Sequence, residues 1–492
     1  MLHRQVLFTC FLLIFSLHAL AQFAVRDSAS LTTGNTLIDE DSLQAPGNNN
    51  VKRGPQKFRI SNEAADISNN DQGSDIFTDI FTLNDCLKYA LKHQPALNQS
   101  FIDERVAHLN NGITLSSWLP QVNGAATFTN YIQGTPVISP STGQVTQNNA
   151  YYTSIPSISA TQTIFNTDVL LAVRAAKLNT LAAQQNITNV KITLVSQVSK
   201  AFYDMLLSVE QIYAFAEDSA RLEKNKSDAY HQYVSGIVDK VDYMQAVIAL
   251  NNTLSQLKTS RETVQAKFAV LKQYMGYRPD KKFAIQFDTT EMMQNIYVDT
   301  LVTLQFEKRI EYQQLQTQKR IQKETTAYYN LGFLPSVSAF YDYNYEFENN
   351  HFSDLYGTAY PYSLWGLQLN IPLFTGLRRI ENIHKSKLLQ ERIDWDEVNL
   401  EMAIYSDYKQ SMSNYKSNIY FLQTQSENVR LAREVYNIVR LQYREGIKAY
   451  LDVIIAENDL KTAEVSYLNA LFQVLESKID LEKSMGDIPV AY

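Results

Sequence analysis

The fold is decided by a short stretch that occurs twice. Residues 232–237 read QYVSGI, and residues 442–447 read QYREGI. Their glycines are 210 positions apart (446 − 236 = 210), and the same offset separates Gly276 from Gly486 (486 − 276 = 210). A fixed offset between similar stretches is typical of an internal repeat. The sequence therefore predicts two similar halves, each with a glycine turn and a second glycine about 40 residues later.

Helix breakers are almost absent around these stretches. No proline occurs between Pro156 and Pro279 or between Pro372 and Pro489. Long helices are therefore predicted at 167–235 and 377–445, return helices at 240–275 and 450–485, and incoming helices at 82–117 and 291–330. At about 1.5 Å per residue each long helix spans about 100 Å, a length that two shorter helices stacked end to end would match. Apolar residues at steps of three and four predict coiled-coil packing.

The composition excludes several classes of protein. Only 16 Gly and 12 Pro occur in 492 residues, which argues against a loop-rich enzyme built from many short elements. Two Cys and seven His exclude a disulfide framework and leave little for a metal site. The formal net charge of −7 gives no basic surface for nucleic acid.

The N-terminus has the pattern of an export signal. Arg4 precedes an apolar core at 6–17, and Ala19 and Ala21 form a small-residue cleavage pattern. No later apolar run is long enough for a transmembrane helix, so any membrane span is expected to consist of strands. The predicted organisation is a signal peptide at 1–21, a disordered polar extension at 22–79, a first repeat at 80–275, a linker at 276–290 and a second repeat at 291–488.

Two strands are predicted between the incoming and long helices of each half, at 121–133, 150–165, 336–348 and 360–374. In the third strand apolar residues alternate with polar ones. One face holds Val337, Ala339, Tyr341, Tyr343, Tyr345 and Phe347, and the other holds Ser338, Asp342, Asn344, Glu346 and Glu348. An apolar outer face and a polar inner face are typical of an outer-membrane barrel, although a hairpin packed on a soluble core is the alternative.

Four strands cannot close a barrel alone. Two chains would give eight strands, whose interior is filled by side chains, whereas three chains give twelve and leave room for a pore. The predicted fold class is therefore mainly α with a transmembrane β-barrel portion. It has two internal repeats, a long α-helical barrel, and a twelve-stranded barrel assembled from three chains.

The region from about residue 80 to 488 resembles the TolC-type outer-membrane efflux proteins. The resemblance rests on FTLNDCL at 81–87 with Ala90 and Asn98, and on Leu-Pro at 119–120 and 334–335. It also rests on IPLFTG at 371–376 and on the two Tyr-x-x-Gly turns with their following aspartates. The resemblance implies a homotrimeric channel with a barrel in outer-membrane lipid and a helical tunnel across the periplasm. Such a channel would export small molecules or proteins, and would dock on a periplasmic adaptor (membrane fusion protein) and an inner-membrane pump.

The glycine turns are expected at the periplasmic end of the tunnel, because the long helices run away from the strands. Glycine there permits the positive φ that ends a helix. The resemblance implies that these turns touch the adaptor. The predicted contact residues are Gly236, Ile237, Val238, Gly446, Ile447 and Ala449.

A gate is predicted beside the turns. By resemblance, Tyr443 and Lys448 tie to Asp242 and hold the tunnel mouth closed. Around a trimer, Asp452 would add a ring of carboxylates that favours cations in a narrow pore. The family often has another acidic residue three positions on, where this chain has Ile455. The alternatives are helix capping for the two aspartates and coiled-coil packing for Tyr443.

The sequence shows no catalytic constellation, phosphate loop or nucleophile elbow, so no enzyme activity, cofactor or metal is predicted. Asp394, Asp396 and Glu397 lie near His384, and they are interpreted as a solvated helix face. A second class of function is an exported periplasmic coiled-coil scaffold or an adaptor protein. Adaptors carry one helical hairpin, whereas this chain duplicates its hairpin and flanks each copy with paired strands.

Overall fold

The computed structural model describes residues 57–61, 80–132, 136–138, 143–147, 151–288, 296–299 and 303–490. The chain divides into two units, residues 1–54 and 55–492, and all described residues belong to the second. The predicted signal peptide and nearly all of the predicted extension lie outside the described residues.

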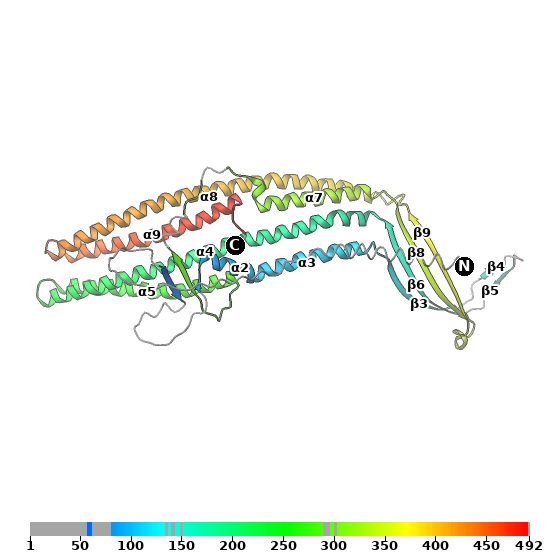
Figure 1. Cartoon of the computed structure of the whole chain (residues 1–492), viewed down its shortest axis with the longest axis horizontal. Helices are drawn as coiled ribbons and strands as arrows, with labels where there is room; N and C mark the ends of the chain where they lie inside the picture. Colours follow the sequence, from blue (N-terminus) through cyan, green and yellow to red (C-terminus); the bar gives the residue numbers. More distant parts are fainter. Residues whose placement is uncertain are drawn as a thin grey trace, which may run out of the picture. The chain divides into compact units, whose positions relative to one another are not determined.

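Helices make up most of the described chain, and both halves use the same order of elements. The helices are α2 (Leu83–His93), α3 (Pro95–Ser116), α4 (Thr167–Val234), α5 (Lys240–Met275), α7 (Ile310–Leu331), α8 (Arg378–Arg444) and α9 (Tyr450–Met485). The long helices α4 and α8 form hairpins with α5 and α9, and α3 and α7 lie beside α4 and α8 nearer the strands (Figure 1). The predicted long and return helices are confirmed to within one residue at each end.

The two incoming helices are shorter than predicted. Pro95 divides the first into α2 and α3, because proline lacks an N–H and drives the preceding residue to an extended conformation; Gln94 has ψ 122°. In the second half the short 3₁₀ helix η1 (Phe306–Lys308) precedes α7, which begins only after the extended Arg309. None of the helices in the described ranges is long and apolar enough to span a lipid bilayer.

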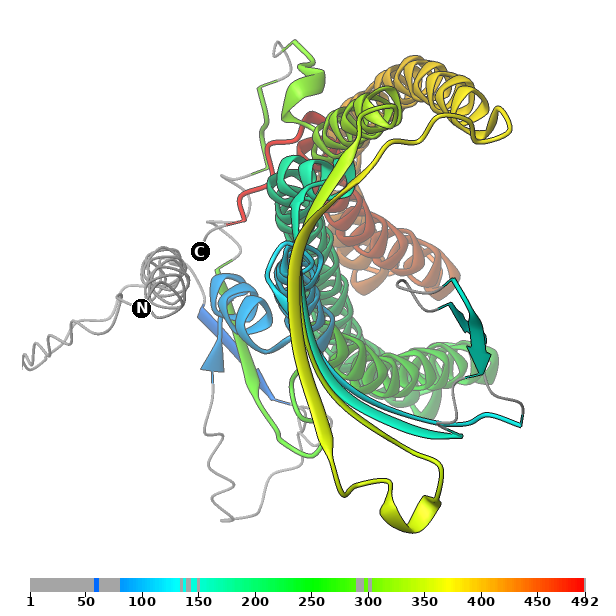
Figure 2. The same ribbon diagram turned by 90° about the vertical axis from the view of Figure 1, so that its right-hand side faces the viewer.

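Four strands form one antiparallel sheet at the end of the helices opposite the hairpin turns (Figure 1). They are β3 (Gln121–Asn130), β6 (Tyr152–Phe165), β8 (Ser336–Asn349) and β9 (Ala359–Asn370), paired in the order β3-β6-β8-β9. Figure 2 shows these strands curving together as one layer. The four predicted strands are confirmed, although β3 ends three residues and β9 four residues earlier than expected, and β6 begins two residues later. Two short strands, β4 (Pro136–Ile138) and β5 (Val145–Gln147), pair separately between β3 and β6.

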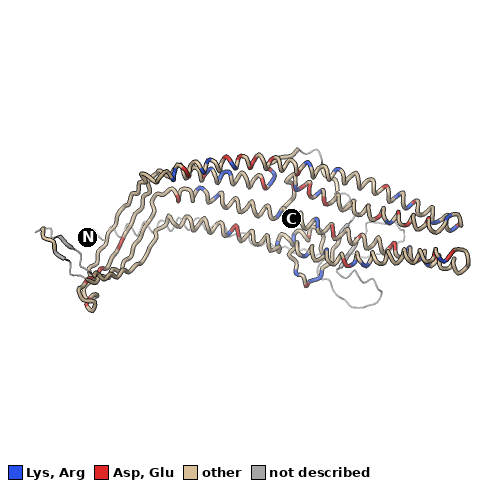
Figure 3. The backbone as a smooth tube through the Cα atoms, turned by 180° about the vertical axis from the view of Figure 1, so that it is seen from behind, with Lys and Arg blue, Asp and Glu red and all other residues tan. Residues whose placement is uncertain are grey.

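The register places apolar side chains of all four strands on one face. Tyr341 lies opposite Trp365 on β9 and Ala160 on β6, and Ala160 lies opposite Val122 on β3. The opposite face carries most of the polar residues together with Ile155, Phe340 and Leu364, and the charged residues of these four strands are three acids on β8 (Figure 3). These acids are Asp342, Glu346 and Glu348. The alternation predicted for the third strand therefore extends across the sheet.

A second sheet lies near the middle of the helices, in the order β1-β7-β2. Its strands are β1 (Lys57–Ser61), β7 (Ala284–Asp288) and β2 (Ile80–Phe81). The prediction of disorder is wrong for 57–61, and the predicted linker 276–290 contains a strand. Five residues give too short a pattern to identify a strand from sequence, because the pairing strand lies more than 200 residues away.

Each return helix meets an incoming helix end to end, at a place we call the joint. Gly276 and Gly486 end α5 and α9 with φ of 66° and 77°. Beside Gly276, the side-chain nitrogen of Gln94 donates to the carbonyls of Gln273 and Tyr274, each at 3.3 Å. Beside Gly486, Arg309 Nη1 donates to the carbonyl of Ser484 at 2.9 Å. Gln94 and Arg309 are the N-cap residues of α3 and α7, so the two joints are alike.

The main core lies around the first joint. It contains residues of α2, α4, α5 and β7, among them the fully buried Cys86, Met205 and Ile285. Burial raises the pKa of the Cys86 thiol to about 12, so this cysteine is an unreactive core residue.

Candidate functional site

Both hairpin turns close in the same way. Gly236 and Gly446 have φ of 75° and 73°, and no atom lies within 4 Å of where a Cβ would stand. The amide of Ile237 donates to the carbonyl of Gln232 at 2.9 Å, and the amide of Ile447 donates to that of Gln442 at 2.8 Å. These bonds satisfy the last carbonyls of α4 and α8, and they require the left-handed backbone that glycine favours.

The turns present apolar side chains to water. Ile237 is 73% exposed and Ile447 is 72% exposed. Gly236, Gly446 and Ala449 are also exposed, whereas Val238 is half-buried. Exposed large apolar side chains at both turns are typical of an interaction surface.

The predicted gate residues lie together beside the turns, but their contacts differ from those expected. The Tyr443 hydroxyl donates to the side-chain oxygen of Gln232, which joins α8 to α4. Lys448 lies 3.7 Å from Asp452, on its own hairpin. Within the described chain neither Tyr443 nor Lys448 bonds to Asp242. The ring of Tyr443 packs against that of Tyr450, with 5.4 Å between the two ring centroids.

Asp242 nevertheless acts on this region through its charge. Burial and the neighbouring Asp239 raise the pKa of Asp242 above its usual value. Burial, together with the charges of Asp242 and Asp228, also raises the pKa of Tyr443. The Tyr443 hydroxyl therefore stays protonated and can only bridge the hairpins as a neutral group.

The two aspartates are not helix caps. The N-cap residues of α5 and α9 are Asp239 and Ala449, and neither makes a side-chain capping bond. Asp242 and Asp452 stand in the first turn, where a negative charge interacts favourably with the helix dipole. The capping alternative therefore does not explain them.

Sequence reasoning missed Gln232 and a buried polar cluster farther along the same hairpins. Glu457 of α9 is 4% exposed and accepts a bond of 2.9 Å from Asn225 of α4. Charged residues within a helical pattern are usually solvated, and the sequence alone does not say which faces of α4 and α9 meet. One signal was available in the sequence. Glu457 corresponds to Val247 in the first half (457 − 210 = 247), so a charged residue stands in the second repeat where the first has an apolar one.

The acidic residues near His384 do not form a site. Glu397 accepts hydrogen bonds from Tyr312 at 3.0 Å and Lys319 at 2.7 Å, and Asp394 pairs with Lys319 at 2.8 Å. The solvated-face interpretation is wrong for Glu397, because these bonds tie α8 to α7. Among the described residues, no group of three His, Cys, Asp or Glu could hold a metal ion.

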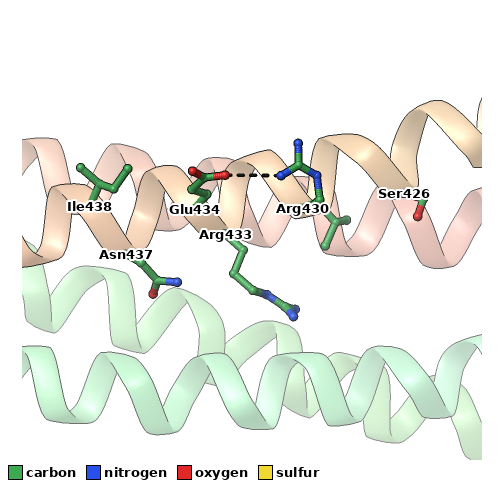
Figure 4. Close-up of a pocket in the computed structure, with 7 residues that line it drawn as sticks. Ser426, Arg430, Arg433, Glu434, Asn437 and Ile438 are labelled. Carbon is green, nitrogen blue, oxygen red and sulfur yellow. Dashed lines mark hydrogen bonds and ion pairs between the residues drawn. The ribbon is translucent and has the colours of Figure 1, made fainter.

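A hollow lies along α8, between the gate and the middle of the helix (Figure 4). All of its lining residues belong to α8, and Arg430 pairs there with Glu434 at 3.4 Å. The lining residues are Ser426, Val429, Arg430, Arg433, Glu434, Asn437 and Ile438. A hollow lined by one helix is a surface on which another element can pack.

Comparisons with known proteins agree on one family. The family model described as "Outer membrane efflux protein" matches residues 86–277 and 329–487. The outer membrane protein TolC of Vibrio cholerae serotype O1 is 18% identical over 303 residues, which cover 60% of this chain and 68% of that protein.

Solved structures share the fold at low identity. The outer membrane protein VceC of Vibrio cholerae has a TM-score of 0.66 at 15% identity, covering 82% of this chain and 96% of VceC. The CmeC outer membrane channel of Campylobacter jejuni has a TM-score of 0.66 at 17% identity, covering 82% of this chain and 85% of CmeC. CusC has a TM-score of 0.67 at 15% identity, covering 83% of this chain and 92% of CusC.

Proposed function

Because this chain belongs to the outer membrane efflux protein family, we propose that it forms a homotrimeric channel-tunnel that exports small molecules or proteins. Members of this family are outer-membrane channels of efflux systems that extend into the periplasm, and they are not enzymes. In the proposal the two repeats, 80–275 and 291–488, each supply two strands and one helical hairpin. The channel would work with a periplasmic adaptor and an inner-membrane pump.

The proposal of a trimer rests on the four-stranded sheet and its two edge strands. Its edge strands, β3 and β9, have no partner on their outer sides within the described chain. Both are long, and an unpaired long edge is a surface for pairing with another strand. Pairing of β9 with β3 of the next copy would close the sheet, and three copies give twelve strands around an open pore.

Exposed apolar stripes on the helices support packing between copies. On α3 the stripe has steps of four, three and four, and on α8 a stripe has steps of three, four and three. The α3 stripe is Ile102, Val106, Leu109 and Ile113, and the α8 stripe is Trp395, Val398, Met402 and Tyr405. Such stripes are the pattern of helices that pack in coiled-coil fashion.

The hairpin turns are the proposed docking surface for the adaptor, and Tyr443 with Asp242, Lys448 and Asp452 is the proposed gate. The bond from Tyr443 to Gln232 supports this assignment, because it holds the two hairpins of one protomer together. The pair Lys448–Asp452 partly neutralises the carboxylate that would face the mouth. Release of that pair would leave one acidic group per protomer, which would favour cations.

Membrane insertion tests the proposed barrel. Leu367→Arg is expected to abolish insertion, because Leu367 is exposed on the apolar face and an arginine facing lipid costs about 2 to 4 kcal/mol near the bilayer midplane. The matched control is Gln368→Arg, on the adjacent residue and the polar face. Membrane fractions and unheated gels would report insertion and trimers. Equal loss in both variants, or in neither, would contradict the assigned faces.

Single-channel conductance tests the gate. Tyr443→Phe removes the hydroxyl that bonds Gln232 but keeps the ring against Tyr450, so conductance is expected to rise several-fold with the fold unchanged. Tyr233→Phe is the control, because Tyr233 is the equivalent residue of the first repeat. Asp452→Ala is expected to lower the preference for cations. Wild-type conductance in the Tyr443 variant would mean that this tyrosine only packs.

A further inference from the structure

A buried polar cluster joins the two hairpins inside one protomer. We call it the Glu457 cluster, and it lies seven residues into α9, about 10 Å from the start of that helix. Every helix of the two hairpins contributes to it. The members are Asp218, Arg221 and Asn225 of α4, Thr253 of α5, Tyr436 and Arg440 of α8, and Tyr450, Glu457, Lys461 and Glu464 of α9.

Glu457 is the acid of the cluster that keeps one carboxylate oxygen unpaired, and the buried hydroxyls of Tyr436 and Tyr450 also lack a hydrogen-bond partner in the described structure. The Oε2 of Glu457 accepts from Asn225 at 2.9 Å, but its Oε1 lies 3.7 Å from Arg221 Nε, too far for a hydrogen bond. In the described structure both of these facing atoms, Glu457 Oε1 and Arg221 Nε, lack a hydrogen-bond partner. A buried carboxylate with one unpaired oxygen is costly, and the cost falls when the group is protonated or hydrated.

Arg221 is drawn away from Glu457 by other acids. It bonds Asp218 at 3.0 Å and lies 3.8 Å from Glu464 and 3.4 Å from Glu217. Asp218 in turn accepts from Thr253 at 3.0 Å and lies 3.9 Å from Lys461. On α8, Arg433 pairs with Glu464 at 2.7 Å, and Arg440 stacks 6.0 Å from the centre of the Tyr436 ring. Glu457 is therefore the group whose charge the cluster compensates least.

The second repeat has no such cluster on its corresponding helices. At the offset of 210, Arg221 and Asn225 of α4 correspond to Leu431 and Val435 of α8, both exposed. Glu457 and Glu464 of α9 correspond to Val247 and Leu254 of α5. If α8 packs on α5 of the next copy, as it would in the proposed trimer, that interface is apolar. The interface within each protomer is the ionic one.

We propose that the Glu457 cluster is a proton-operated latch inside each protomer, which holds the α8–α9 hairpin against α4–α5 when Glu457 is protonated and weakens when it is ionised. The proposal rests on the proposed function in one respect, that the channel opens by parting the hairpins at these turns. The apolar interfaces between copies stay closed while the ionic interface within each copy parts.

The direction of the pH effect follows from linkage. Burial first, and then the charge of Asp218, raise the pKa of Glu457 from 4.5 to about 7, against the opposing effects of Arg221, Asn225 and Arg440. In the parted state Glu457 is hydrated, and its pKa returns to about 4.3. The closed state therefore binds the proton more tightly. The stability that the closed state gains over the parted state from this proton is complete below about pH 4 and is lost as the pH rises to about 7.

The test compares wild type with Glu457→Gln, which has the shape of the protonated acid at every pH. For wild type the ratio of open to closed time in planar bilayers is expected to rise by about 10- to 100-fold between pH 5.5 and pH 8. Glu457→Gln is expected to give the same ratio at every pH, below the wild-type value at pH 5.5, because the wild-type closed state has already lost part of its advantage at that pH. Two controls keep the dependence, namely Asp459→Asn, which removes an exposed acid on the same helix, and His231→Gln, which removes an exposed histidine near the turn.

Hydrogen exchange of the same preparations gives a reading that does not need a pore. Amides of 450–464 are expected to exchange faster in wild type than in Glu457→Gln at pH 8, and the ratio of the two exchange rates is expected to fall by about 10- to 100-fold at pH 5.5 and to reach one near pH 4. Equal exchange of the two proteins at pH 8 overturns the latch. So does a conducting wild-type pore whose opening does not depend on pH. A protein that shows the exchange difference but conducts at no pH would retain the latch and contradict the proposed channel.

Discussion

Gly276→Ala is expected to lower the free energy of unfolding by about 3 to 4 kcal/mol. Two costs add at this residue. A non-glycine residue with φ of 66° costs about 1 to 2 kcal/mol. In addition, a Cβ would stand 2.8 Å from the carbonyl oxygen of His93 and 2.9 Å from Gln94 Cα, and these backbone atoms cannot rotate away. Gly486→Ala is expected to behave alike, because its Cβ would stand 2.9 Å from the Lys308 carbonyl.

Gly236→Ala provides a matched control for the joint. Gly236 has nearly the same backbone conformation, but its Cβ would meet open space, so only the conformational cost of about 1 to 2 kcal/mol applies. Denaturant unfolding of the purified protein in detergent, followed by circular dichroism, measures the difference. If the two variants lose the same stability, the backbone contact at the joint contributes nothing.

Arg309→Met is expected to cost about 3 kcal/mol, the second large effect. The Arg309 side chain is only 9% exposed, and it holds Asp407 at 2.9 Å, Glu311 at 3.1 Å and the carbonyl of Ser484. Methionine fills a similar volume but leaves the buried carbonyl without its donor. The end of α9 and the start of α7 then lose the bond that aligns them.

The control for Arg309 is Arg278→Met. Arg278 also forms an ion pair with a nearby acid, Asp280, at 3.2 Å, but its side chain is 70% exposed. Exposed pairs of this kind contribute about 0 to 1 kcal/mol. Unfolding midpoints of the two variants should therefore differ clearly, and an Arg309 variant no less stable than the Arg278 variant would show that the joint tolerates its loss.

Much of this architecture follows from the sequence because it is repeated and periodic. The offset between QYVSGI and QYREGI predicted the two helical hairpins, and the alternation around Tyr341 predicted which residues share each face of the sheet. Both signals run over many residues, so local exceptions do not hide them. The family resemblance rested on the same duplicated stretches.

Other features depend on which surfaces meet, and a single sequence does not state this. The partner of Tyr443 is Gln232, 211 positions away, and Lys448 takes the nearer Asp452 rather than Asp242. The bond to Gln232 forms because the two hairpins end at the same place, with α4 packed against α9. Pro95 can be recognised in the sequence as a helix breaker, but the sequence does not show that the break lies beside Gly276.

The joint also sets the order in which the newly exported chain can fold. Its hydrogen bonds connect residues 180 positions apart in the first half and 175 apart in the second. Helix α3 emerges first and must wait for the end of α5, yet closing so long a loop costs little more than closing a short one. The hydrogen bonds of the first joint lie within residues 94–274, so they can form before the second repeat is complete. The core around this joint is completed only by the end of the second repeat, which contributes Ile479 and Ile488.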